Sequence, residues 1–117
     1  MRIVSEMEFR ARLVNVLACA RTDDVGAVTG PGRSGAIAAV YASHLLGVPF
    51  IPQGARVPDL VRLLVIDTAR ESGATLRKMA RRYPGALIIA CFEEPPRVAF
   101  WYESAKPQHY KHEVTKC

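Results

Sequence analysis

The stretch Leu63-Leu-Val-Ile-Asp-Thr-Ala-Arg-Glu-Ser-Gly-Ala-Thr-Leu76 decides the fold of this chain. It completes an apolar run, Leu60–Ile66, which predicts a short strand buried on both faces. An acidic residue, Asp67, follows at the tip of that strand, and Ser72-Gly-Ala-Thr75 then opens a helix. Backbone N–H groups at a helix start bind anions, and a carboxylate accepts hydrogen bonds from hydroxyls. The stretch therefore predicts a strand–loop–helix unit that holds a phosphorylated ribose.

A second unusual loop, Thr29-Gly-Pro-Gly-Arg-Ser-Gly35, lies at an earlier strand-to-helix junction. Its glycines permit close backbone approach to a ligand, and Arg33 adds charge-assisted donors. A tight turn capped by Ser34 would need one glycine rather than three, so an anion site is favoured. The loop also spells G-x-G-x-x-G, but no acid ends the next strand near Gln53, which makes a nicotinamide site the weaker interpretation.

The rest of the chain predicts alternating helices and strands. Ser5-Glu6-Met7-Glu8 has capping-box spacing and begins a helix that runs to Ala20. Helices are also expected over Ala36–Leu46, ended by Gly47, and over Ala74–Tyr83. The expected strands are Val25–Thr29, Val48–Pro52 as an edge strand because of its prolines, Leu60–Ile66, Ala86–Cys91 and Val98–Tyr102.

This alternation predicts a three-layer α/β/α fold with a mainly parallel five-stranded sheet. The doubly wound rules favour the strand order 2-1-3-4-5, in which ligands bind where the first and third strands splay apart. The loops that leave those two strands are Gly30–Gly35 and Asp67–Ser72. The two loops are therefore expected to be neighbours in space.

Length and composition indicate one domain over residues 1–117: an N-terminal helix in 1–24, a core in 25–103 and a polar tail in 104–117. The net charge of +5 fits a polyanionic partner, either a small phosphorylated molecule or nucleic acid. No apolar run approaches the ~20 residues of a membrane span, and a cytoplasmic protein is expected. Cys19 and Cys91 are expected to be small core residues. His109 and His112 lack the further ligands of a metal site.

The second loop resembles the phosphoribosyl-pyrophosphate (PRPP) signature of type I phosphoribosyltransferases: apolar residues, two acids, variable positions, then Thr/Ser-Gly-x-Thr. The first loop resembles the pyrophosphate loop of that family. The segment Glu93–Glu103 is similar to the base-side ending of its purine and xanthine-guanine members. The resemblance covers roughly residues 25–103.

The resemblance implies a role for each motif residue. The 5′-phosphate would be held by Ser72, Gly73, Ala74 and Thr75, and the ribose hydroxyls by Asp67 with Thr68. Pyrophosphate with Mg²⁺ would be held by Gly30, Gly32, Arg33, Ser34 and Gly35. Glu71 and Asp67 would be the catalytic carboxylates, and the candidates to stack on a base are Phe100, Trp101 and Tyr102. A homodimer is also implied, and no metal ligand set is expected from the protein alone.

Two departures from the family pattern affect catalysis more than ligand binding. Thr68 replaces the second acid, and the long flexible hairpin before the signature strand is reduced to Gln53–Asp59. Without such a lid the site stays wet, which weakens charge stabilisation. Three functions remain open: a minimal phosphoribosyltransferase that acts on a nucleobase, a non-catalytic nucleotide or PRPP sensor, and a basic nucleic-acid-binding protein.

Overall fold

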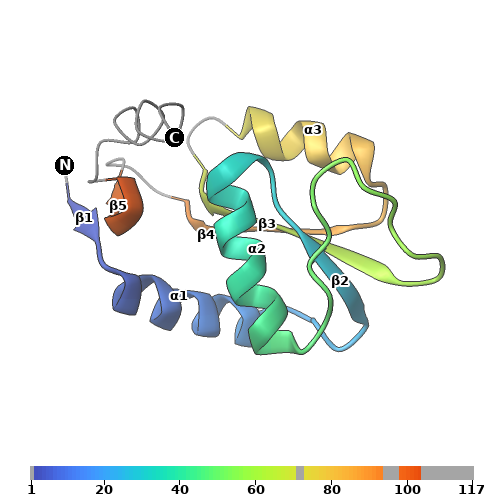
Figure 1. Ribbon diagram of the computed structural model, residues 1–117, viewed down its shortest axis with the longest axis horizontal. Coiled ribbons are helices and arrows are strands. Elements are labelled where there is room, and N and C mark those ends of the chain that lie inside the picture. Colours follow the sequence, from blue (N-terminus) through green and yellow to red (C-terminus); the bar gives the residue numbers. More distant parts are fainter. Residues whose placement is uncertain (1, 71–72, 94–97, 104–117) are drawn as a thin grey trace, which may run out of the picture.

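The computed structural model describes residues 2–70, 73–93 and 98–103. Figure 1 shows the course of the chain through them. The elements are β1 (Ile3–Val4), α1 (Glu6–Cys19), β2 (Val25–Thr29), α2 (Gly32–Leu46), β3 (Arg62–Ala69), α3 (Ala74–Arg82), β4 (Leu87–Phe92), β5 (Ala99–Phe100) and a 3₁₀ turn, η1 (Trp101–Glu103).

The central sheet is parallel and has the order β2-β3-β4. Val65 in β3 pairs with Thr29 on one side and Ile88 on the other. The expected edge strand is reduced to a single parallel bridge between Phe50 and Val28. Pro49 and Pro52 flank that bridge and carry no N–H to extend the ladder. The first four strands of the predicted order therefore have the expected neighbours, although the outermost of them is a single bridge rather than a strand.

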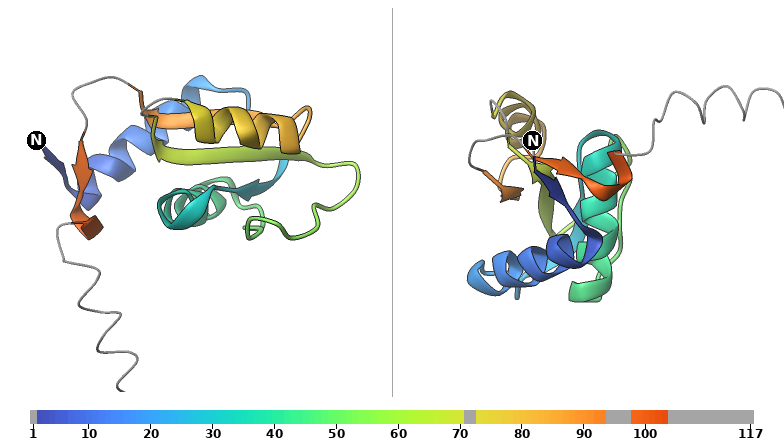
Figure 2. Two further views of the ribbon diagram at one scale, coloured as in Figure 1. Left: turned by 90° about the horizontal axis from the view of Figure 1, so that it is seen from above. Right: turned by 90° about the vertical axis from the view of Figure 1, so that its left-hand side faces the viewer.

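Helices cover both faces of this sheet, as the α/β prediction requires (Figure 2). Side chains alternate along a strand, so Leu64 and Ile66 join the core under α1 and α2. Leu63 and Val65 belong to the opposite core, which α3 completes with two buried apolar side chains. The three-layer arrangement predicted from the sequence is confirmed.

The C-terminal strand does not add to the edge of β4. β5 pairs in parallel with β1, with Val4 opposite Phe100, and the two strands form a separate sheet at the left of Figure 1. This pairing buries Phe100 to 2% exposure between the rings of Phe9 and Phe92, at 6.2 and 5.5 Å. β5 therefore lies outside the main sheet, and the five-strand order predicted from the sequence is not observed.

The helix ends predicted from capping residues are found where the sequence placed them. Ser5 Oγ accepts the Glu8 amide hydrogen bond at 3.1 Å at the start of α1, and Gly47 ends α2 with φ of 69°. The first loop is shorter than expected, because α2 begins at Gly32 rather than Ala36. Cys19, expected in the core, is exposed, whereas Cys91 is buried.

β3 is longer than expected and continues to Ala69. Asp67 pairs with Ala90 and Ala69 pairs with Phe92, because the ladder to β4 persists past the apolar run. Asp67 and Thr68 therefore belong to the strand itself, and the second loop begins at Arg70. Within the described part of the chain, no helix is long and apolar enough to cross a membrane.

Candidate functional site

The two loops meet at the carboxyl ends of β2 and β3. The backbone of Gly30 lies so close to β3 that a Cβ added there would be 2.5 Å from the carbonyl oxygen of Ile66. A cavity of about 330 Å³ lies at this junction. It is lined by Ser34 in the first turn of α2, by residues 67–70 at the end of β3, and by Gly73, Thr75 and Leu76 at the start of α3. Val98, Phe100 and Glu103 complete the lining. Its volume is in the range that accepts a small-molecule ligand.

Each glycine of the first loop has a structural reason of its own. A Cβ on Gly30 would collide with the carbonyl oxygen of Gly35, and one on Gly35 would lie 2.5 Å from Pro31 Cδ. Gly32 has open space around it but a φ of +63°. The number of glycines therefore does not by itself indicate an anion site here, because close packing requires Gly30 and Gly35, and the left-handed backbone favours glycine at Gly32.

The start of α2 is held by groups that sequence reasoning did not identify. The N-cap residue, Pro31, makes no side-chain cap. Ser34 does not cap the helix either. The amide of Gly32 instead donates to Gln53 Oε1 at 3.0 Å. Gln53 comes from the short segment before β3, and no local pattern could have linked it to a loop 21 residues earlier.

Tyr102 connects the two loops. Its hydroxyl donates to Ser34 Oγ at 2.9 Å, and its side chain is also hydrogen-bonded to Thr68. Burial raises the pKa of the Tyr102 phenol, and the bonds to Ser34 and Thr68 act in the opposite direction. The phenol therefore stays protonated at neutral pH and remains a donor.

Thr68 is positioned for this contact rather than for solvent. It is only 3% exposed, whereas the carboxylate of Asp67 beside it lies at a half-buried position. Asp67 Oδ1 accepts the Thr68 amide hydrogen bond at 2.8 Å. The hydroxyl that replaces the second acid of the family pattern thus belongs to a link with Tyr102.

The three aromatic candidates for base stacking differ in their positions. Phe100 lines the cavity. Trp101 packs on Phe9 and Tyr41, with ring centroids 5.6 and 6.3 Å apart, and does not line the cavity. Tyr102 stacks on Phe100 at 5.8 Å and 9°. These rings serve the core, and only Phe100 also borders the cavity.

Two carboxylates face the same cavity, from Asp67 and Glu103. Glu103 Oε2 also accepts the Phe100 amide at 2.9 Å, and sequence reasoning had not singled this residue out. No cluster of three or more metal-ligating side chains exists in residues 2–70, 73–93 and 98–103. Mg²⁺ is commonly bound by one or two carboxylates together with substrate phosphates, and these two carboxylates fit that pattern.

The remaining predicted residues fall into two groups. Arg33 is exposed on the first turn of α2, outside the cavity lining, and Ala74 is the first residue of α3. Glu71, Ser72 and the tail 104–117 lie outside the described residues. The structure therefore gives the position of only part of the predicted phosphate loop.

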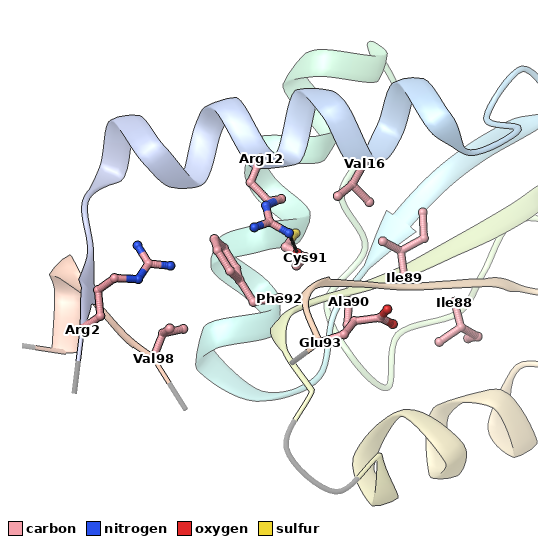
Figure 3. A pocket seen from close by; sticks show the side chains of 10 residues that line it. All are labelled: Arg2, Arg12, Val16, Ile88, Ile89, Ala90, Cys91, Phe92, Glu93 and Val98. Atoms are coloured by element: carbon pink, nitrogen blue, oxygen red, sulfur yellow. Dashed lines mark hydrogen bonds between the residues drawn. The ribbon is translucent and has the colours of Figure 1, made fainter. Parts of the chain in front are cut away.

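A larger cleft of about 510 Å³ runs between α1 and the outer edge of β4. Figure 3 shows the guanidinium of Arg12 over the Phe92 ring, hydrogen-bonded to the Cys91 carbonyl. Arg2, which also lines the cleft, is paired with Glu8. The cleft follows the edge where the predicted fifth strand would have paired, and it contains neither loop. We therefore assign the site to the smaller cavity.

Comparison with known proteins identifies the fold. The chain is similar in structure to the xanthine-guanine-hypoxanthine phosphoribosyltransferase of Helicobacter pylori, with a TM-score of 0.68 and 14% identity over 95% of this chain and 97% of that chain. It is similar to a purine phosphoribosyltransferase from Pyrococcus horikoshii OT3, with a TM-score of 0.64 and 17% identity over 86% and 94% of the two chains. A hypothetical protein from Neisseria gonorrhoeae with bound ppGpp gives a TM-score of 0.67 and 11% identity over 95% and 94%.

No model of a protein family matches the sequence, and no curated protein matches it. The solved structures nevertheless show the fold. This chain has the fold of the type I phosphoribosyltransferases, as the two loop motifs predicted. At these identities the likeness concerns the fold alone, and function must be argued from the site.

Proposed function

We propose that this protein binds PRPP or a nucleoside monophosphate in the 330 Å³ cavity at the carboxyl ends of β2 and β3. The observation that carries the proposal is the convergence of Ser34 with Asp67, Gly73 and Thr75 on that one cavity. A hydroxyl, a carboxylate and the N-terminus of a helix are the groups that a phosphorylated ribose requires. The solved phosphoribosyltransferases that share the fold support the same ligand class.

The proposed contacts follow the family motif. Ser72, Gly73, Ala74 and Thr75 hold the 5′-phosphate, and Asp67 accepts the ribose hydroxyls. The pyrophosphate lies at the start of α2, against Gly32, Arg33 and Ser34. Glu71 and Phe100 face the base. Mg²⁺, when bound, neutralises phosphate charge beside Asp67.

Ligand binding is favoured over phosphoribosyl transfer because the segment before β3 that would cover the site is short. Only residues 52–61 separate Ile51 from β3, and this segment includes the exposed Arg56, Asp59 and Leu60. A lid that excludes water would have to come from elsewhere, and charge stabilisation depends on such exclusion. The buried link between Thr68 and Tyr102 also removes one hydroxyl from the ribose side. A sensor that binds without turnover is therefore the alternative to a phosphoribosyltransferase.

The binding experiment is a titration of the whole chain with PRPP, AMP, GMP and ribose 5-phosphate, each with Mg²⁺ and with EDTA. Adenosine and guanosine serve as the unphosphorylated controls. The proposal requires saturable binding of at least one phosphorylated ligand, and a rise in Tm with ligand concentration, because a ligand that binds only the folded state stabilises it. Failure of every phosphorylated ligand to bind overturns it.

A second assay separates transfer from binding. Pyrophosphate release from PRPP is measured with adenine, guanine, hypoxanthine, xanthine and orotate. Release that depends on a base identifies a transferase, whereas tight PRPP binding without release identifies a sensor. Oligonucleotide binding that weakens steeply with salt, in the absence of nucleotide binding, would favour the nucleic-acid function instead.

Three further expectations belong to this proposal. A second copy of the chain would complete a homodimer, Mg²⁺ would enter with the pyrophosphate, and the protein would act in the cytoplasm. Sedimentation of the purified chain, with and without PRPP and Mg²⁺, tests the first of these directly.

A further inference from the structure

The side chains of two arginines that the family motif does not specify lie beside the proposed phosphate loop. Gly73 is the N-cap of α3, with φ of 80° and no side-chain cap. The side chain of Arg77 folds back over it, so that a Cβ on Gly73 would lie 2.9 Å from Arg77 Nη1 and 3.9 Å from its Cζ. Arg70 lies close to the same point, with its Cδ 3.8 Å from that Cβ position. The N-terminus of α3 is thus flanked by two guanidinium side chains.

The backbone explains how Arg77 reaches this point. Helical side chains lean toward the N-terminus of their helix, and the Arg77 amide donates to the Gly73 carbonyl at 2.9 Å. Arg77 is therefore one turn along from the cap, on the exposed face of the helix. Gly73 leaves space for the guanidinium because it has no side chain.

Arg70 is fixed from another direction. Its amide donates to the Phe92 carbonyl at 2.8 Å, which anchors it beside the end of β4. Its guanidinium forms an ion pair with Glu93 at 3.3 Å, and the two side chains are 41% and 56% exposed. An ion pair this exposed is weak, so an incoming phosphate can compete with Glu93 for the guanidinium.

Positive charge is concentrated where the helix dipole is also positive. Cations are disfavoured at a helix N-terminus and anions are favoured there. The Arg77 guanidinium beside the N-terminus of α3, with the Arg70 side chain next to it, therefore fits a ligand with more than one negative charge. A phosphate monoester carries about −1.5 to −2 near pH 7, with a second pKa of about 6.

Resting on the proposed function, we propose that Arg77, with Arg70 beside it, is a binding side chain for the 5′-phosphate and selects its dianionic form. Arg77 donates to the phosphate oxygens over the Gly73 turn. Arg70 adds a second cation that Glu93 holds in position when no ligand is present. These two residues make the site specific for a ribose that ends in a phosphate monoester.

The test compares Arg77→Gln with Arg81→Gln, which removes the same charge one turn further along the exposed face of α3. Titration with ribose 5-phosphate should give a Kd about tenfold or more higher for Arg77→Gln, because a charge-assisted hydrogen bond is lost. Arg81→Gln should stay within about twofold, since a charge that is remote and exposed is screened. Circular dichroism and Tm confirm that both variants are folded.

A pH series provides the second readout. Wild-type affinity for ribose 5-phosphate should increase as pH rises through about 6, where the phosphate becomes a dianion, and Arg77→Gln should lose most of that increase. Equal Kd values for wild type and Arg77→Gln, or equal losses in both variants, overturn the role of Arg77 and leave the proposed function standing. A wild-type chain that binds neither ribose 5-phosphate nor PRPP overturns both.

Discussion

Replacement of Tyr102 by phenylalanine tests the contact that joins the two loops. The change removes one oxygen and keeps the ring, which stacks on Phe100. Two side-chain hydrogen bonds are lost, to Ser34 and to Thr68. Of these partners, Ser34 is half-buried and regains water at little cost. Thr68, at 3% exposure, has its side chain inside the protein.

The expected loss of stability follows from that difference. A hydrogen bond contributes about 1 kcal/mol net, and a buried group left without a partner costs about 1–3 kcal/mol. We expect Tyr102→Phe to lower the free energy of unfolding by about 2 kcal/mol. For a chain of 117 residues, an unfolding entropy of about 2.1 cal/mol/K per residue converts this to a Tm decrease of about 8 °C.

Thermal and urea denaturation measure the effect, with Tyr83→Phe as the matched control. The Tyr83 hydroxyl accepts one exposed, long hydrogen bond from the Gly54 amide, at 3.4 Å, so its removal should lower Tm by about 2 °C or less. The double variant Thr68→Val/Tyr102→Phe should be less destabilised than the sum of its single variants, because both partners are then apolar. Equal Tm values for the two tyrosine variants, or strict additivity in the cycle, would refute the link.

Three other predictions use the same structure. Gly30→Ala should lower the free energy of unfolding by about 3 kcal/mol or more, because its Cβ would meet two backbone carbonyl oxygens. Gly32→Ala should lower it by only about 1–2 kcal/mol, the cost of an alanine in the left-handed conformation. Urea denaturation measures both variants, and a Gly30→Ala variant as stable as Gly32→Ala contradicts the prediction. Burial raises the pKa of the Cys91 thiol to about 12 from 9.0. The contribution of the neutral thiol to stability should therefore be complete below pH 9, and the free energy of unfolding should fall by about 1.4 kcal/mol per pH unit between pH 9 and 12. Cys91→Ala should flatten the stability–pH profile there, with Cys19→Ala as the control for removal of a surface thiol, and an unchanged slope in Cys91→Ala rules the linkage out. Asp67→Asn should raise the Kd for PRPP about tenfold, because bonds to ribose hydroxyls weaken without the charge, and calorimetry that shows an unchanged Kd excludes this role.

Most of the fold could be predicted because its signals are local. The alternation of apolar runs with helical patterns predicted the parallel sheet and its two helical layers. Ser5 and Gly47 marked helix ends through their side-chain chemistry and backbone freedom. The winding rules then brought the two loops together at adjoining strand ends, which the cavity between Ser34 and Asp67 bears out.

Other local patterns in the sequence had two possible causes. Three glycines in the first loop suggested a ligand, but Gly30 and Gly35 are required by contacts inside the protein. The apolar neighbours of Cys19 suggested burial, but α1 turns that position outward. In each case the missing information was the identity of the packing partner.

The sequence by itself determined the class of fold, the helix ends marked by Ser5 and Gly47, and the two segments that border the site. The tertiary structure alone decided that β5 pairs with β1, that Tyr102 joins Ser34 to Thr68, and that Arg77 turns back over Gly73. The physical reason is the range of the interactions. Propensity, capping and periodicity act within about one helical turn or one strand and leave a pattern in neighbouring residues. A contact such as Tyr102 with Ser34 joins residues 68 positions apart. It depends on the pairing of β5 with β1, which no pattern in neighbouring residues reveals.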